Sequence, residues 1–315
     1  MSGRASVYQG VQVGVEATPG EAVAANKRLL CTFIDPKPRV SVEGYRPQGS
    51  KFTTTESLPQ NDHTMAAISG KIGYNDIAYL LTSCLCNPSG AFTFKPEAFG
   101  PDTCKTLTVQ TGSSVRAEQF TYGAVTALDF EVTRAAVNLT GEMIGQKTEE
   151  GATLTASPTA LARAVVSPKH VKVYVGDSVG GLTKLSKLLV ARFGIKGRHV
   201  PGFYVDADEE SFTETVEDAP ELTSSIVVEH NSVAAGYMAD LRTAKQKFLR
   251  LHALGPEVSP GLQYEFRVTA PFVFQDNDRG DQDKTYASTF NLIPKFEDGF
   301  AGALEVYLVN ALGGL

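Results

Sequence analysis

The chain has 315 residues, of which 42% are hydrophobic and 20% charged, a composition typical of a globular protein rather than a disordered or fibrous one. No apolar run approaches the length of a membrane span, and the first residues lack the basic and apolar regions of a secretory signal. We therefore expect no membrane contact and a protein made in a cytoplasm. The net charge of −6 argues against a protein that binds nucleic acid by neutralising phosphates.

Residues 1–28 are small and polar, and we interpret them as an N-terminal arm. Strands are predicted over 29–34 and from Val40, and a stretch rich in threonine and turn formers follows at 44–60. Because this stretch lacks a continuous apolar face, we expect a long hairpin or loop that projects from the body. Its candidate contact residues are Tyr45, Arg46, Gln48, Lys51 and Phe52.

The stretch 64–86 changes its hydrophobic period in the middle, which predicts a strand followed by a helix. Asn75 or Asp76 is expected to cap the helix, since each has a short side-chain oxygen that can accept a backbone N–H. One apolar stripe then follows at i, i+3, i+4 and i+7, formed by Ile77, Leu80, Leu81 and Cys84.

The strand-then-helix order returns at 221–248, which indicates an internal duplication. Alternating residues over 124–144 predict a hairpin with one buried and one solvated face, and the pair 286–309 is interpreted as its counterpart. Each half is thus predicted to be mostly β with one packed helix.

These patterns divide the chain into two similar domains. The first is placed at 29–146 and the second at 168–315. The small and polar stretch 147–167 has no clear period and is interpreted as the linker between them.

An acidic run lies at 206–221, with eight acidic residues and no basic one. Such runs are usually solvated loops, and the alternative is a negative patch that faces a lumen or meets a basic neighbour, for instance Arg46 and Lys51. The candidate residues of this patch are Asp206, Asp208, Glu209, Glu210, Glu214, Glu217 and Asp218.

No pattern in the chain predicts catalysis. Phosphate-loop, metalloprotease and hydrolase motifs are absent, the five histidines stand apart, and we expect no enzyme, cofactor or metal. The four cysteines Cys31, Cys84, Cys86 and Cys104 are expected to be buried free thiols. The aspartate cluster 276–283 fits a solvated hairpin tip better than a weak cation site, because its glycine comes too early for a calcium loop.

Three short motifs resemble those of the major tail tube proteins of long-tailed bacteriophages. They are VGVEATPG at 13–20, RPQG at 46–49 in the projecting stretch and YNDIAY at 74–79 at the start of the helix. The resemblance covers 1–145 and is weaker over the rest of the chain, where the opening motif is missing.

The resemblance implies a β-sandwich with one flanking helix per domain and long hairpins that join subunits into an inner barrel. The implied function is structural, a hollow tail tube in the virion through which DNA is ejected without specific binding. It also implies assembly in the host cytoplasm with a tape measure protein and with tail tip or terminator proteins. The alternative is a baseplate or surface binding module of β-sandwich type.

Two expectations follow from combining the duplication with this resemblance. A chain that supplies two ring positions should form a trimeric ring with pseudo-six-fold symmetry, stacked into a tube. The lumen should carry a net negative charge, because each cation facing it could hold a DNA phosphate.

Overall fold

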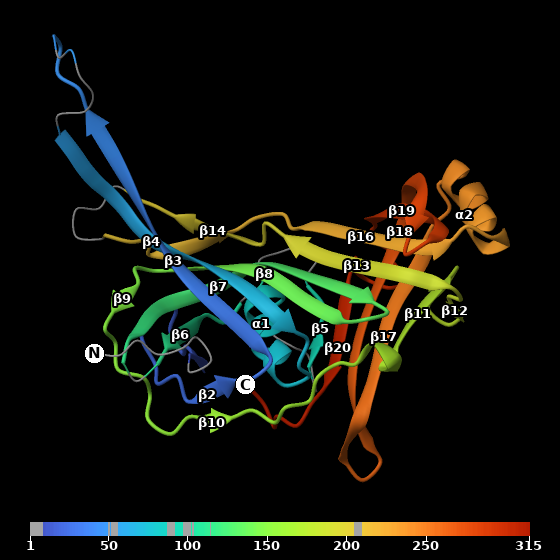
Figure 1. Cartoon of the computed structure of the whole chain (residues 1–315), viewed down its shortest axis with the longest axis horizontal. Helices are drawn as coiled ribbons and strands as arrows, with labels where there is room; N and C mark the ends of the chain where they lie inside the picture. Colours follow the sequence, from blue (N-terminus) through green and yellow to red (C-terminus); the bar gives the residue numbers. More distant parts are fainter. Residues whose placement is uncertain are drawn as a thin grey trace.

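The computed structural model describes residues 9–49, 51, 56–86, 92–96, 102, 104–113, 115–204 and 210–315, without the side chains of residues 56, 58 and 59 (Figure 1). The chain is mostly β, as the alternating sequence pattern predicts. Its described residues contain two α-helices, α1 (Asp76–Cys84) and α2 (Ser232–Arg242), one in each half.

In the first half, seven strands pair antiparallel in the order β2-β1-β6-β7-β8-β4-β3. In that order the strands span Lys27–Leu29, Gly10–Val15, Leu107–Gly112, Ala117–Thr133, Val137–Gly145, Glu56–Lys71 and Thr32–Tyr45. Helix α1 follows β4.

The second half repeats this topology strand for strand, in the antiparallel order β12-β11-β17-β18-β19-β16-β13. In that order the strands span Thr183–Lys184, Val171–Gly176, Lys247–Ser259, Leu262–Gln282, Thr285–Pro294, Glu221–Glu229 and Leu188–Lys196. Helix α2 follows β16, just as α1 follows β4. The predicted repeat of the strand-helix unit is therefore present in the structure.

The predicted hairpin at 286–309 is wrong in its pairing. Strand β19 pairs with β16 and β18, whereas β20 (Glu305–Val309) pairs with another part of β18 and with β5 (Thr93–Phe94). The counterpart of the β7–β8 hairpin is β18–β19. Strand β18 continues through the polar residues after Phe274, which the sequence pattern assigned to a loop.

The two halves are joined edge to edge. Residues 190–195 of β13 pair antiparallel with residues 128–133 of β7, so eight strands form one sheet in the order β3-β4-β8-β7-β13-β16-β19-β18. Short pieces complete the chain. They are β9 (Glu149–Glu150), β10 (Thr159–Ala160), the 3-10 helix Pro168–His170, and the separate ribbon of β14 (His199–Gly202) and β15 (Glu214–Glu217).

One hydrophobic core serves both halves. Residues on one face of the joined sheet alternate with polar ones, and the buried set includes Phe130, Phe193 and Phe290. Every residue of α1 is buried, including the predicted apolar stripe. The helix therefore has no solvent-facing side on which charged residues would be expected. Helix α2 is more exposed and contacts the core through Tyr237, whose ring lies 5.1 Å from that of Phe274.

The segment interpreted as an arm contains a core strand, which corrects that interpretation. Val11 and Val13 of β1 are buried between β2 and β6. The linker 147–167 does connect the halves, and it lies along the first half rather than crossing solvent. Its β10 pairs with β2, Leu161 and Val166 are buried, and the Val166 N–H donates to the Ile72 carbonyl.

The expected caps of α1 have other roles. Asn75 makes no side-chain cap, and its amide instead donates to the Ala162 carbonyl and accepts from the Ala311 N–H. The Asp76 carboxylate accepts the backbone N–H groups of Leu30 and Cys31 at 3.0 and 2.6 Å. Both residues therefore fasten distant parts of the chain to the start of the helix.

The β3–β4 hairpin projects from the body, as predicted for 44–60 (Figure 1). Its strands extend further into that stretch than expected, with Tyr45 opposite Glu56. Every side chain from Lys37 to Tyr45 is exposed, so this part of β3 contributes little to the core of the monomer.

Candidate functional site

The candidate functional surface is the polar face of the eight-stranded sheet, on the opposite side from the hydrophobic core. Cross-strand partners in an antiparallel ladder point to the same face, so the pairings identify its residues. Among the described side chains of this face, the charged ones are the acidic Asp35, Glu43, Asp129, Glu131, Glu142, Glu221, Glu229, Asp276 and Asp278 and the basic Lys37, Arg39, Lys71, Arg192 and Lys196. These nine carboxylates and five cations leave the described part of this face with a net negative charge.

The joint between the halves runs through the middle of this polar face. Arg192 of β13 bridges to Glu131 of β7 at 2.8 Å across the joint. Beside this pair, Gly194 gives room to Asp129, whose carboxylate lies where a Cβ on residue 194 would be. A shallow groove of about 650 Å³ follows the joint, lined by polar residues such as Thr223 and Asn291.

Both outer edges of the sheet are open in the single chain. One edge is β3, and the other is the distal part of β18, residues 276–282, which pairs only with β19 among the described strands. Seven successive antiparallel pairings separate the two edges, so β3 and β18 run in opposite directions. The chain therefore presents two antiparallel-compatible edges, the arrangement that invites pairing with another chain.

A second connection between the halves is the β14–β15 ribbon. It is inserted between β13 and β16, at the position that the projecting tip of the β3–β4 hairpin holds in the first half. Unlike that hairpin, the ribbon lies against the first half. The Phe212 ring contacts the Tyr122 ring at 5.1 Å, and the Gln146 amide donates to the Phe212 carbonyl.

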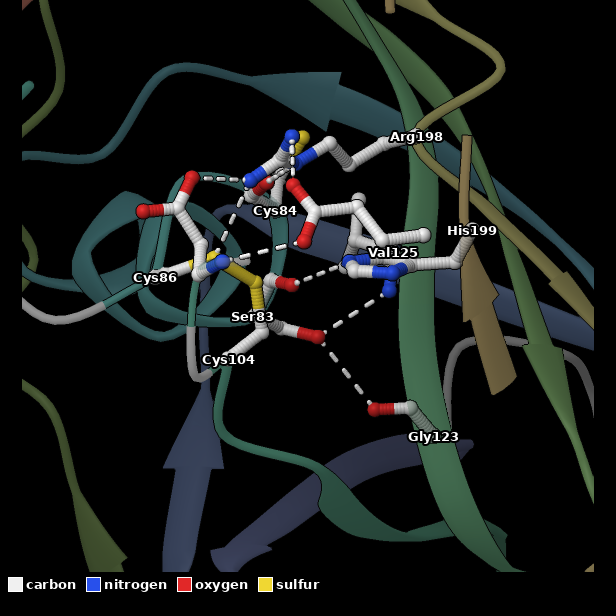
Figure 2. The surroundings of a disulfide bond; sticks show 10 residues. Ser83, Cys84, Cys86, Cys104, Gly123, Val125, Arg198 and His199 are labelled. Carbon is white, nitrogen blue, oxygen red and sulfur yellow. Dashed lines mark hydrogen bonds and ion pairs between the residues drawn. A yellow bond between two sulfur atoms is a disulfide. The ribbon is translucent and has the colours of Figure 1, made fainter. Parts of the chain in front are cut away.

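A buried arginine anchors this ribbon to the end of α1. The guanidinium of Arg198 donates to the Cys84 carbonyl at 3.2 Å and pairs with Asp102 and with Glu217, the latter at 2.5 Å (Figure 2). The Arg198 side chain is only 4% exposed, so two carboxylates compensate one charge removed from water. The guanidinium of Arg198 thus connects the end of α1, Asp102 and β15.

Cys86 and Cys104 form a disulfide beside this cluster, which corrects the expectation of four free thiols (Figure 2). Cys31 and Cys84 remain free and buried, as expected. Burial raises the pKa of the Cys84 thiol to about 12, so this group stays protonated and unreactive at neutral pH. The disulfide ties the end of α1 to the segment that carries Asp102.

His199 completes the contact with α1. Its Nε2 lies 3.3 Å from the Ser83 carbonyl, and the Ser83 hydroxyl in turn binds the backbone of β7, donating to Gly123 and accepting from Val125 (Figure 2). Burial, together with the positive charge of Arg198, lowers the pKa of His199 to about 4. The imidazole is therefore neutral at physiological pH.

The described residues of the acidic run do not gather in one patch, although its last residue, Glu221, lies on the polar face. Asp206, Asp208 and Glu209 lie outside the described residues. Glu217 compensates Arg198, and Glu210 pairs with Lys147 on the first half. Glu214 accepts the Tyr204 hydroxyl, and Asp218 is exposed and accepts the Ala219 N–H.

The candidate contact residues of the projecting stretch lie at the outer end of the β3–β4 hairpin. Tyr45 is 56% exposed, and Arg46, Gln48 and Lys51 are exposed as well. Phe52 lies outside the described residues.

Several residues of the candidate site were not predicted from the sequence. Arg198 and Asp102 carry no local signal, because their pairing depends on tertiary contacts. Lys37 and Arg39 of β3 could have been found from the sequence, because they alternate with Pro36 and Pro38. This pattern is typical of an edge strand with one charged face.

Within the described ranges, no group of three or more histidine, cysteine or acidic side chains is placed to hold a metal ion. The aspartate cluster 276–283 is the tip of the β18–β19 hairpin, with Gln282 opposite Thr285. Among the described residues, no helix has the length and apolarity needed to cross a membrane. No protein-family model and no curated protein sequence matches the chain.

Proposed function

We propose that the chain is a structural subunit that polymerises as stacked rings into a hollow bacteriophage tail tube, in which DNA passes along the polar sheet face. One observation carries the proposal. Two halves of identical topology already join edge to edge inside one chain. The resulting sheet still has two open edges, β3 from the first half and the distal part of β18 from the second. If copies of the chain join one another as the two halves join inside it, the sheets close into a ring. Such closure is favourable because it removes exposed strand edges.

The charge of the polar face supports a conduit for DNA. A wall that carries more carboxylates than cations does not hold phosphates, and exposed charges repel DNA only weakly through solvent and salt. The role is mechanical, with no chemical step and no cofactor. In the proposed assembly, the partners are further copies of the chain, a tape measure protein and tail tip or terminator proteins, all within the virion tail after assembly in the host cytoplasm.

Electron microscopy of the purified protein tests this function. At high concentration, or after addition of a tail initiation complex, we expect annular or tubular particles with a continuous central channel. A protein that remains a dispersed monomer under both conditions would contradict the proposal, and so would a channel lined mainly by lysine and arginine.

A further inference from the structure

We propose that β3 of one copy pairs with the distal part of β18 of a second copy, in the register of the internal β7–β13 joint, with Lys37 opposite Asp278. This inference rests on the proposed assembly and specifies its seam residue by residue. It follows from a correspondence between the two halves, which is established in two steps.

The first step aligns the β7–β8 hairpin with the β18–β19 hairpin by two shared landmarks. Each hairpin ends in a two-residue connection, after Thr133 in the first half and after Gln282 in the second. Each also has one bulge before that connection, at Thr126 and at Gln275. Both landmarks give the same alignment, in which Asp129 of β7 corresponds to Asp278 of β18.

The second step aligns β3 with β13 through their neighbours. Ala67 of β4 is opposite Glu142, and Ser225 of β16 is opposite Asn291, which occupies the place of Glu142. The strand outside Ala67 presents Asp35.

On the side of β16 away from β19, Ser225 is opposite Arg192 of β13. Asp35 and Arg192 therefore occupy equivalent positions in the two halves. Two residues further along, Lys37 corresponds to Gly194.

The internal joint then predicts the external one. Inside the chain, Gly194 is opposite Asp129, so Lys37 of one copy is expected opposite Asp278 of the next. One rung further along the same face, Arg39 falls opposite Asp276. Both rungs place a cation against a carboxylate, the favourable choice for directly opposed residues.

Two prolines make this seam weaker than the internal joint. The ladder from β3 to β4 spans Pro36 and Pro38, which have no N–H, so the odd-numbered residues must donate to β4. The backbone groups of the even-numbered residues then point to the open edge. Two backbone N–H donors are missing there, at Pro36 and Pro38. Proline at an edge strand limits unwanted pairing, and here it leaves much of the seam to side-chain charges.

Both strands are accessible for this pairing. Side chains 37–39 and 278–281 are exposed, and the described ion-pair neighbour of Lys37 is the exposed Asp35, at 3.5 Å. The two edges run in opposite directions, as an antiparallel seam requires. The opposed side chains of both strands are therefore open to a second copy.

Cysteine cross-linking between two separately purified variants tests the register. Directly opposed residues of an antiparallel pair have Cα atoms about 4.5–5.5 Å apart, within the span of a disulfide. A mixture of Lys37→Cys and Asp278→Cys proteins, oxidised by copper phenanthroline, should give a covalent dimer several-fold more efficiently than Lys37→Cys mixed with Gln282→Cys. The control position lies about 13 Å further along β18. Wild-type protein controls for the native thiols.

Salt supplies a second readout. Raising the ionic strength to about 1 M, where the Debye length is about 3 Å, should lower the yield of the 37–278 cross-linked dimer, because the neighbouring rung of Arg39 and Asp276, which neither substitution removes, depends on opposed charges. Equal dimer yields for positions 278 and 282, or no dimer in either mixture, would overturn the register. Tubes seen by microscopy without the 37–278 cross-link would reject this seam alone. A specific cross-link without tubes would reject the tube function alone.

Discussion

The buried guanidinium of Arg198 is the residue whose loss should weaken the connection between the halves most. Substitution Arg198→Met keeps much of the side-chain volume but leaves Asp102 and Glu217 without their cation. We expect a loss of about 3–5 kcal/mol in the free energy of unfolding, as is typical when one partner of a buried ion pair is removed. Urea denaturation measures it.

Arg192→Met is the matched control for this experiment. Arg192 also pairs with a carboxylate across the two halves, but its side chain is 59% exposed, and exposed pairs contribute about 0–1 kcal/mol. Equal effects of the two substitutions would mean that burial does not distinguish the two ion pairs.

His199 should make stability sensitive to acid. Its pKa is lowered to about 4 in the folded state, whereas the side chain of an unfolded histidine titrates near its ordinary pKa of 6.5. Between these values the unfolded chain binds the proton that the folded chain excludes, so stability is lost as the pH falls from about 6.5 to 4.

The expected slope from this one group is at most about 1.4 kcal/mol per pH unit. His199→Gln, which cannot titrate, should show a shallower fall in unfolding free energy over the same range. Parallel pH profiles for the variant and the wild type would show that another group causes the acid sensitivity.

Residue-scale contacts were the least predictable from the sequence. Two cysteines separated by 18 positions become partners only because α1 ends where the later segment passes. Arg198 lies in a short polar connection that predicts solvent exposure, and the burial of its charge depends on carboxylates from two other segments.

At the scale of elements, the β3–β4 hairpin should be dispensable for folding but needed for stacking of rings. Replacing residues 43–58 with a two-residue turn removes side chains that, where described, are exposed in the monomer apart from the half-buried Pro47. We expect a change of less than about 1 kcal/mol in unfolding free energy, since surface changes usually cost little.

The same variant should still form rings but no tubes under the microscope. Shortening the β18–β19 tip by removing residues 282–285 provides a comparison on the other hairpin. If both variants stack normally, the projecting part of β3–β4 has no role between rings.

Elements with long alternation or strong helical period were predicted well, such as β4 with α1 and β16 with α2. Strand β1 was missed because its short apolar run is interrupted by Gly14, which the neighbouring Ala24 carbonyl approaches closely. The distal part of β18 was missed because its residues are polar on both sides, and hydrophobic alternation cannot reveal a strand at an exposed edge.

At the scale of the whole molecule, the duplication explains why the chain is not two independent domains. One hydrophobic cluster spans both halves. Contacts between aromatic side chains cross from one half to the other, such as that of Phe130 with Phe266, whose ring centroids are 5.5 Å apart. The repeated topology of the first half begins at β1, upstream of the predicted boundary at 29, and the packing makes the two halves one unit.

The ring should contain three chains. The tail tube family that the sequence resembles uses six-fold rings of single domains, and each chain here supplies two domain-like halves joined at a fixed angle by β7–β13. If the seam between copies repeats the internal joint, the rotation per half is constant and six halves close the ring. Native mass spectrometry should then give a species of three 33.7 kDa chains. Image averages should show six similar lobes that alternate between two types. Rings of six full-length chains, with only one half of each on the channel, would show that the second half decorates the tube instead of building it.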